Sequence, residues 1–145
     1  MTMSLGDFVA QARSRINEIT ADEVGVFLEN HETVLLIDVR EPAEYAKGHI
    51  PGALLVPRGI LEEAADAHSK RRVPELCAAQ NQVVVLYCES GGRSALAADV
   101  LQQMGFTQVL SLAGGCVLWE AEGFPLIEAG AGIDDSRVAQ PSLKT

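Results

Sequence analysis

Short apolar runs alternate along the chain with segments of helical periodicity. Five of these runs have strand length and are rich in branched residues, which favours buried β-strands over helices. Apolar strands that alternate with helices indicate an α/β domain around a mainly parallel sheet. The predicted strands are 16–20 ("INEIT", at an edge), 33–38 ("TVLLID"), 53–57 ("ALLVP"), 82–88 ("QVVVLYC") and 108–112 ("QVLSL").

Helical periodicity and helix-capping signals fill the segments between these strands. Apolar residues at helical spacing predict an amphipathic helix over 5–15. Thr20 and Glu23 form a capping-box pattern that opens a helix running to about residue 28. Further predictions are a short helical turn over 41–48, a helix over 59–80 with a break before Pro74, a helix over 94–105, a last helix over 116–123, and a mobile tail from 128.

The length and charge of the chain narrow the classes of function. A chain of 145 residues suits one compact domain. The amino terminus has no apolar region typical of a signal peptide, and no apolar stretch is long enough to span a bilayer, so a cytoplasmic location without membrane contact is expected. With 11 basic and 20 acidic residues, the net charge of −9 argues against nucleic acid as a partner. An anionic substrate approaches against this field.

Three widely spaced cysteines do not suggest a disulfide framework. The count is odd, and no cluster of cysteine and histidine has the spacing of a metal site, so no metal is expected. Cys77, in a predicted helix, is interpreted as a packing residue. For Cys116, which follows two glycines, a small buried residue is favoured over a redox or resolving role.

The segment "VVVLYCESGGRSALAADVLQQMGF" places Cys88 between a buried strand and the start of a helix. Amides at a helix start lack intrahelical acceptors, and the helix dipole adds partial positive charge there. Gly91 and Gly92 let the loop turn its amides inward as an anion-binding nest. Such surroundings favour the thiolate, which is the nucleophile, and Arg93 adds a positive charge nearby. The loop therefore predicts a reactive thiol.

Three segments together resemble the single-domain rhodanese family of sulfurtransferases. The first, "LLIDVREPAEYAKGHIPGALLVP", is similar to that family's amino-terminal signature. The second is the cysteine loop with its helix. The third, "LAGGCVLWEAEGFPL", is similar to the family's closing pattern. The resemblance implies a single rhodanese-like domain over 19–127, with a five-stranded sheet flanked by helices on both faces, a helical extension over 1–18 and a flexible tail over 128–145.

The resemblance also implies a mechanism without a cofactor. Cys88 attacks the outer sulfur of a small anionic donor such as thiosulfate, or of a protein or low-molecular-weight persulfide, and then carries a persulfide. A thiol or cyanide accepts this sulfur. The residues whose backbone amides would bind the terminal sulfur are Glu89, Ser90, Gly91, Gly92, Arg93 and Ser94.

Other residues of the signatures are assigned supporting roles. Asp38 and Arg40 are interpreted as a structural ion pair near the site, and His49 as a structural residue rather than a general base. Trp119 is assigned to the core rather than to a substrate platform.

Two further functions are weighed against sulfur transfer. A non-catalytic docking module is disfavoured by the intact cysteine loop. A small phosphatase or arsenate reductase is disfavoured because such related domains have a loop one residue longer than the six residues from Cys88 to Arg93.

Glu89 departs from the family pattern and generates the first prediction. Many thiosulfate-using relatives carry a basic residue directly after the cysteine. A carboxylate ~4–6 Å from an anionic substrate makes the free energy of binding that substrate less favourable by about 1–3 kcal/mol at an effective dielectric near 20. Glu89→Gln is expected to raise kcat/KM for thiosulfate by about 3- to 30-fold at low salt, and the gain shrinks as ionic strength rises. Steady-state rates at two salt concentrations measure this, with Glu89→Arg expected to go further. Equal kinetics in all three proteins would contradict the prediction.

Overall fold

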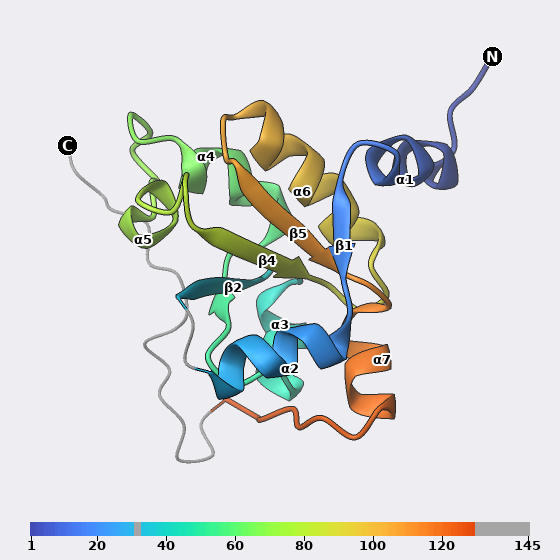
Figure 1. Cartoon of the computed structure of the whole chain (residues 1–145). Coiled ribbons are helices and arrows are strands. Elements are labelled where there is room, and N and C mark those ends of the chain that lie inside the picture. Colours follow the sequence, from blue (N-terminus) through green and yellow to red (C-terminus); the bar gives the residue numbers. More distant parts are fainter. Residues whose placement is uncertain (31–32, 130–145) are drawn as a thin grey trace.

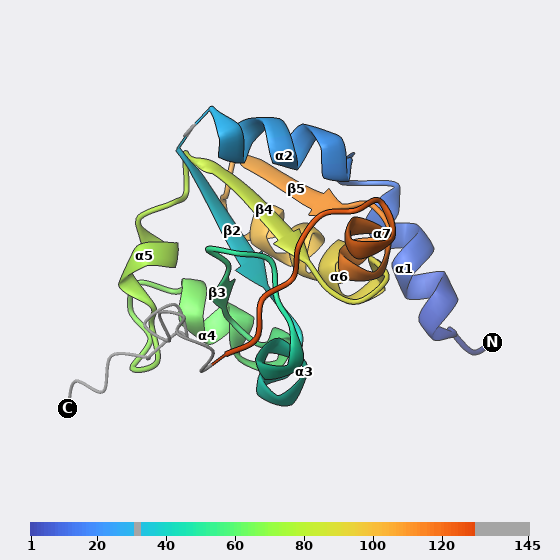
Figure 2. The ribbon, with the colours of Figure 1, turned by 90° about the horizontal axis from the view of Figure 1, so that it is seen from below.

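Five parallel strands form the central sheet of the computed structural model, which describes residues 1–30 and 33–129. Their order across the sheet is β1-β5-β4-β2-β3, so that β4 lies in the centre and β1 lies at an edge, as predicted (Figure 1; β3 is labelled in Figure 2). The strands are β1 (Asn17–Ile19), β2 (Val34–Asp38), β3 (Leu54–Leu55), β4 (Val83–Tyr87) and β5 (Gln108–Leu112).

Helices cover both faces of this sheet, which confirms the predicted architecture (Figures 1 and 2). The cluster on one face takes its helical residues from α4, α5 and α6, and the cluster on the other face takes them from α2, α3 and α7. The helices are α1 (Leu5–Arg13), α2 (Ala21–Glu29), α3 (Pro42–Lys47), α4 (Leu61–Ala65), α5 (Pro74–Cys77), α6 (Gly92–Gln103) and α7 (Gly115–Ala121), with a 3-10 turn η1 at Arg58–Ile60.

Alternation along the strands divides the buried side chains into two cores. In β4, Val84 and Leu86 pack in the core that includes α6, whereas Val85 and Tyr87 pack in the core that includes α7. Successive side chains of a strand point to opposite faces, so the residue after Tyr87 is directed toward the α6 face. Cys88 is that residue, and it belongs to the α6-side core.

Helix α2 starts at the predicted capping box. The Glu23 amide donates to Thr20 Oγ1 at 3.2 Å, and the Thr20 amide donates to Glu23 Oε1 at 3.1 Å. These reciprocal bonds satisfy two amides that the helix itself leaves without acceptors. The box therefore sets where the chain turns from edge strand β1 into α2.

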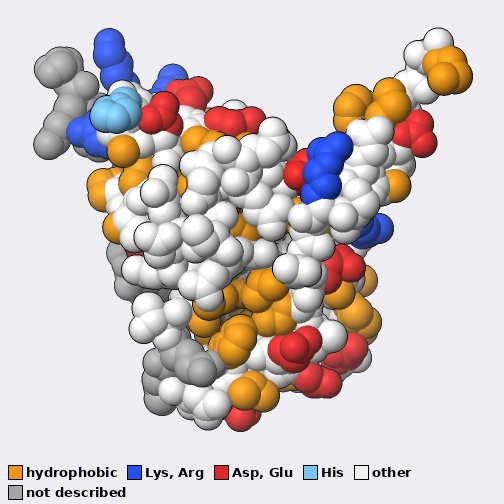
Figure 3. All heavy atoms as spheres, turned by 45° about the horizontal axis from the view of Figure 1, so that its top comes forward, with side chains coloured by type: hydrophobic (Ala, Val, Ile, Leu, Met, Phe, Trp, Pro, Cys, Tyr) orange, Lys and Arg blue, Asp and Glu red, His pale blue; other side chains and the backbone are white. Residues whose placement is uncertain are grey.

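Helix α1 packs against α6 and projects from the body of the molecule (Figures 1 and 3). Its Ala12 is buried, whereas hydrophobic side chains gather along the projecting segment in Figure 3. The exposed hydrophobic residues of this segment are Met1, Met3, Leu5 and Phe8.

The single broken helix predicted over 59–80 is wrong. The structure has η1, the short helices α4 and α5, and an irregular turn over residues 66–73. Asp66 Oδ1 accepts the His68 amide at 2.9 Å, and Ser69 Oγ accepts the Arg71 amide at 3.0 Å. Short polar side chains that bond nearby amides compete with helical hydrogen bonds, and here they replace them.

Strand β1 straddles the boundary placed between residues 18 and 19, because its pairing with β5 already begins at Asn17. Most of the predicted mobile tail, residues 130–145, lies outside the described residues. Within the described part of the chain, no helix is both long enough and apolar enough to cross a membrane.

Candidate active site

The sulfur of Cys88 lies under the first turn of α6. Cys88 follows the central strand β4 and is 1% exposed. The Gly91 amide donates to Sγ at 3.1 Å and the Ser94 amide donates at 3.4 Å. Both donors belong to the start of α6, where amides have no acceptor within the helix. Negative charge on this sulfur is therefore stabilised by backbone groups already oriented toward it.

Gly91 makes this geometry possible. It is the N-cap of α6, with φ of 108°, a conformation that glycine adopts without the steric cost that other residues incur. The turn at Gly91 directs its own amide and the Ser94 amide toward the same sulfur. The predicted inward turn of the loop is thus present, with two amides on the unmodified thiol.

Ser111 is a buried polar partner of the site that sequence reasoning missed. The hydroxyls of Ser94 and Ser111 lie 2.8 Å apart, and both residues are fully buried. Ser94 Oγ also donates to the Gly91 carbonyl at 3.2 Å and accepts from the Cys88 thiol at 3.6 Å. The signal was a serine inside the apolar strand β5, at the position that faces α6. The hydroxyl of Ser111 thus holds in place the hydroxyl of Ser94, which contacts the Cys88 sulfur.

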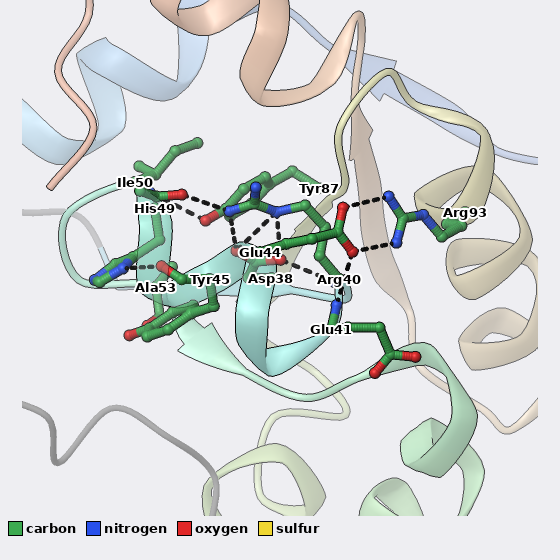
Figure 4. A network of polar contacts seen from close by, with 11 residues as sticks. Asp38, Arg40, Glu41, Glu44, Tyr45, His49, Ile50, Ala53, Tyr87 and Arg93 are labelled. Atoms are coloured by element: carbon green, nitrogen blue, oxygen red, sulfur yellow. Dashed lines mark hydrogen bonds and ion pairs between the residues drawn. The ribbon is translucent and has the colours of Figure 1, made fainter. Parts of the chain in front are cut away.

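Arg93 is bound by a carboxylate of α3. Its guanidinium donates to Glu44 Oε1 at 2.8 Å and to Glu44 Oε2 at 3.0 Å, a bidentate pair that joins α6 to α3 (Figure 4). Hydrogen bonding to Arg93 lowers the pKa of Glu44 to about 2. Arg93 was expected to add a positive charge near the thiol, whereas in the structure the Glu44 carboxylate neutralises it.

Asp38 and Arg40 form a buried ion pair at the end of β2. Arg40 Nη2 lies 2.8 Å from Asp38 Oδ2, and the same nitrogen donates to the Gly48 carbonyl at 2.7 Å (Figure 4). Burial alone would lower the pKa of Arg40, but hydrogen bonds and charge from Asp38 raise it overall. The Arg40 guanidinium also lies 5.7 Å from the centre of the Tyr87 ring. The pair thus connects two neighbouring strands to the loop after α3.

His49 lies within the packed loop after α3. Its ring stacks on Tyr45 at 3.7 Å with an interplanar angle of 4°, and its Nδ1 lies 3.0 Å from the Tyr45 carbonyl (Figure 4). The amide and carbonyl of its backbone pair with Ile127 at 2.9 Å in both directions. These contacts couple the loop to the end of the domain and leave His49 2% exposed.

Cys116 contacts the backbone of Cys88, but the two side chains pack in different cores. The Cys116 amide donates to the Cys88 carbonyl at 2.9 Å. The Cys116 side chain packs in the α7-side core and that of Cys88 in the α6-side core. Burial raises the pKa of the Cys116 thiol. This arrangement fits a packing residue and gives no support to a resolving role.

Cys77 and Trp119 each make hydrogen bonds to backbone carbonyls outside the cysteine loop. The Cys77 thiol donates to the Ala64 carbonyl at 3.3 Å, and burial raises its pKa. Trp119 is 2% exposed, stacks on Phe124 at 4.5 Å, and donates from Nε1 to the Pro125 carbonyl at 2.9 Å. Both contacts are those of structural residues.

A pocket of about 410 Å³ opens beside the loop. Glu89, the exposed residue next to Cys88, lines it together with Glu44 and Arg40. Its other lining residues come from α3 and its following loop, from α7 and from the last described segment: Lys47, Gly48, Glu120, Leu126 and Glu128. Ser90 is exposed at the tip of the loop.

The described residues contain no group of three or more histidine, cysteine or acidic side chains placed to hold a metal ion. The Cys88 loop presents a thiol held by backbone amides beside a pocket. A sulfur at the end of a central parallel strand, under a helix start, is positioned as a nucleophile.

Comparison with known proteins identifies this arrangement. The model of the family described as "Rhodanese-like domain" matches residues 20–122. The chain belongs to this family. The matched range includes the signature residues discussed above, which are Asp38, Arg40, His49, those of the loop from Cys88 to Ser94, and Trp119.

Named relatives place the chain among the rhodanese-domain sulfurtransferases. It is 38% identical over 112 residues to a sulfurtransferase of Allochromatium vinosum, covering 77% of this chain and 95% of that one. A solved structure from Rhodopseudomonas palustris, described as a protein of unknown function and possible tyrosine phosphatase, has a TM-score of 0.80 and 32% identity, covering 88% of this chain and 96% of that one. The thiosulfate sulfurtransferase of Pseudomonas aeruginosa has a TM-score of 0.71 and 25% identity, covering 86% of this chain and 22% of that one.

Gly115 is expected to tolerate no side chain, because α7 begins against the backbone of the loop. Its φ is 60°, and a Cβ there would overlap the carbonyl groups of Cys88 and Glu89. Gly115→Ala should therefore lower the free energy of unfolding by about 2 kcal/mol or more, from the left-handed conformation and the overlap together. Denaturant unfolding measures the change.

Gly59→Ala is the matched control for this substitution. Gly59 has ordinary φ and open space where a Cβ would lie, so the change should stay within about 0.5 kcal/mol. Equal unfolding midpoints for the two variants would show that the contact between α7 and the loop is not tight.

The pair of Glu44 and Arg93 predicts a pH dependence of stability. The folded pKa of Glu44 is lowered from 4.5 to about 2, so the pair stabilises the fold above pH 4.5 and loses this contribution as the pH falls toward 2. Glu44→Gln should cost up to about 1 kcal/mol near neutral pH, because the pair is partly exposed, and the difference from wild type should shrink below pH 4.5. Urea unfolding from pH 7 to pH 2.5 tests this, with Glu29→Gln as the control for lost charge. A difference that grows on acidification would have the wrong sign.

Proposed function

We propose that the chain is a sulfurtransferase that carries sulfane sulfur as a persulfide on Cys88. The observation that carries the proposal is the pair of amides, from Gly91 and Ser94, that donate to the Cys88 sulfur at the start of α6. Relatives named sulfurtransferases support the reaction class. The donor and the acceptor named below are part of the proposal.

In the first half-reaction, the Cys88 thiolate attacks the outer sulfur of a donor such as thiosulfate. The bond between the two sulfurs of the donor breaks, and sulfite leaves with the electron pair. Cys88 then carries one additional sulfur, and its charge lies near the amides at the start of α6. Gly92 and Arg93 belong to the first turn of that helix, so their amides also lack intrahelical acceptors and are available to the outer sulfur.

In the second half-reaction, a thiolate or cyanide attacks the outer sulfur of the persulfide. The sulfur–sulfur bond breaks, the acceptor leaves with the sulfur, and the electron pair returns to Cys88 as thiolate. The Gly91 and Ser94 amides stabilise this leaving group as they stabilise the free thiolate. No oxidant and no cofactor enter the balance.

The alternatives have different requirements. A phosphatase or arsenate reductase needs a loop that surrounds a tetrahedral oxyanion, and the loop here has the shorter, six-residue length of sulfurtransferases. The Rhodopseudomonas structure described as a possible tyrosine phosphatase makes this comparison worth testing. Release of phosphate from p-nitrophenyl phosphate at a rate above that of Cys88→Ser would favour the phosphatase. A docking module would neither bind sulfur covalently nor release phosphate.

Cys88→Ser is expected to abolish persulfide formation and thiocyanate production while the protein stays folded. The hydroxyl of serine is not ionised at neutral pH and cannot form a persulfide, whereas its size fits the same site. Intact mass after incubation with thiosulfate or inorganic polysulfide should show a gain of one sulfur atom in the wild type and none in the variant. Wild-type sulfur loading of Cys88→Ser would refute the assignment of the nucleophile.

Cys77→Ser and Cys116→Ser are the matched controls. Cys77 lies in α5, and the Cys116 side chain lies in the other core, so both variants should keep sulfur loading and thiocyanate production. Circular dichroism of all three serine variants separates loss of fold from loss of chemistry.

A further inference from the structure

The charges lining the pocket beside the Cys88 loop do not cancel. This inference rests on the proposed function, and it concerns which acceptor takes the sulfur. Arg40 lines the pocket but is paired with buried Asp38 at 2.8 Å, and Glu44 lines it but is paired with Arg93 at 2.8 Å. Arg40 and Arg93 are thus each already paired with a carboxylate.

The remaining charges of the lining are mostly negative. Among the described residues, Glu89, Glu120 and Glu128 have no ion-pair partner. Lys47 is the one cation of the pocket lining that also has no ion-pair partner among these residues. Three carboxylates against one ammonium leave two net negative charges around the pocket. The net charge of −9 of the whole chain adds to the same potential.

We propose that the pocket selects an acceptor thiol that carries a positive charge beside its sulfur, and that Glu89, Glu120 and Glu128 are the specificity-determining residues. Such a charge is found on a small aminothiol or on a cysteine flanked by lysine in a partner protein. The pocket of about 410 Å³ is large enough for a small molecule or for one side chain and its neighbours. The Cys88 loop supplies the sulfur and the carboxylates set the preference.

The position of Glu89 explains how this preference acts on the reaction. It directly follows Cys88, is exposed and is one of the residues that line the pocket. An attacking thiolate brings negative charge toward the persulfide, past these carboxylates. An ammonium group on the same acceptor offsets that repulsion, whereas a carboxylate on the acceptor adds to it. The attack itself is the second half-reaction above, in which the acceptor leaves as a persulfide and Cys88 returns to thiolate.

The test is a series of acceptor thiols that differ in charge. Wild-type protein is loaded with inorganic polysulfide, loading is verified by intact mass, and discharge is timed with cysteamine, 2-mercaptoethanol and mercaptoacetate. Rates are expressed per thiolate, because the three thiols ionise differently. At low salt, the ratio of the cysteamine rate to the mercaptoacetate rate is expected to be about 10-fold higher in the wild type than in Glu89→Gln/Glu120→Gln/Glu128→Gln. In 0.5 M salt this factor should fall severalfold.

Dividing the wild-type ratio by that of the triple variant cancels the intrinsic reactivity of each thiol. Glu29→Gln is the control for the loss of a carboxylate elsewhere on the surface: it removes one carboxylate at the end of α2, outside the pocket lining, and should leave the ratio as in the wild type. Peptides with a cysteine between two lysines or between two glutamates distinguish the source. A preference for the lysine peptide supports a protein acceptor, and a preference confined to cysteamine supports a small aminothiol.

The outcomes separate this inference from the proposed function. A protein that takes up no sulfur on Cys88 from any donor would overturn the sulfurtransferase itself. A protein that loads normally but whose ratio of the cysteamine rate to the mercaptoacetate rate is the same in the wild type and in the triple variant would overturn the acceptor preference alone.

Discussion

The junction between β4 and α6 is the constraint on which the rest of the site depends. β4 is the central strand, and its alternation directs Cys88 toward the α6 face. Directly after it, Gly91 turns the chain so that α6 begins with amides on the sulfur. A buried thiol would otherwise be an inert packing residue. Here the same backbone that begins the helix provides the positive ends of dipoles to a developing thiolate.

The neighbouring charged side chains mainly hold this junction in place. Asp38 and Arg40 fasten the end of β2 to the loop after α3, and Glu44 with Arg93 fastens α3 to the start of α6. Each pair neutralises an arginine that would otherwise attract anions. The backbone groups that donate to the Cys88 sulfur are amides, whose charge does not change with pH, and the pocket beside the loop keeps an excess of carboxylates.

Much of the fold was readable from local pattern. The five strands, the capping box of α2, the glycine turn before α6 and the location of Cys88 at the end of a strand all follow from residues adjacent in sequence. The segment 59–80 was misread because helical periodicity continued through it. Asp66 and Ser69 bond to nearby amides there, and Val73 returns its amide to the Ala64 carbonyl. A local competition of that kind is not visible in apolar spacing.

Residues close together in the chain were enough to predict most of the succession of strands and helices, the candidate nucleophile and the short loop around it, because these depend on neighbours within a few residues. Which charges remain unpaired depends on contacts between distant segments. Glu44 is 49 positions from Arg93, and Ser111 is 17 positions from Ser94. The fold brings them together, because it places the Glu44 side chain of α3 beside the start of α6 and packs α6 on β5. An ion pair or hydroxyl contact between distant segments has no local signal, so the electrostatics of the site emerged only from the fold.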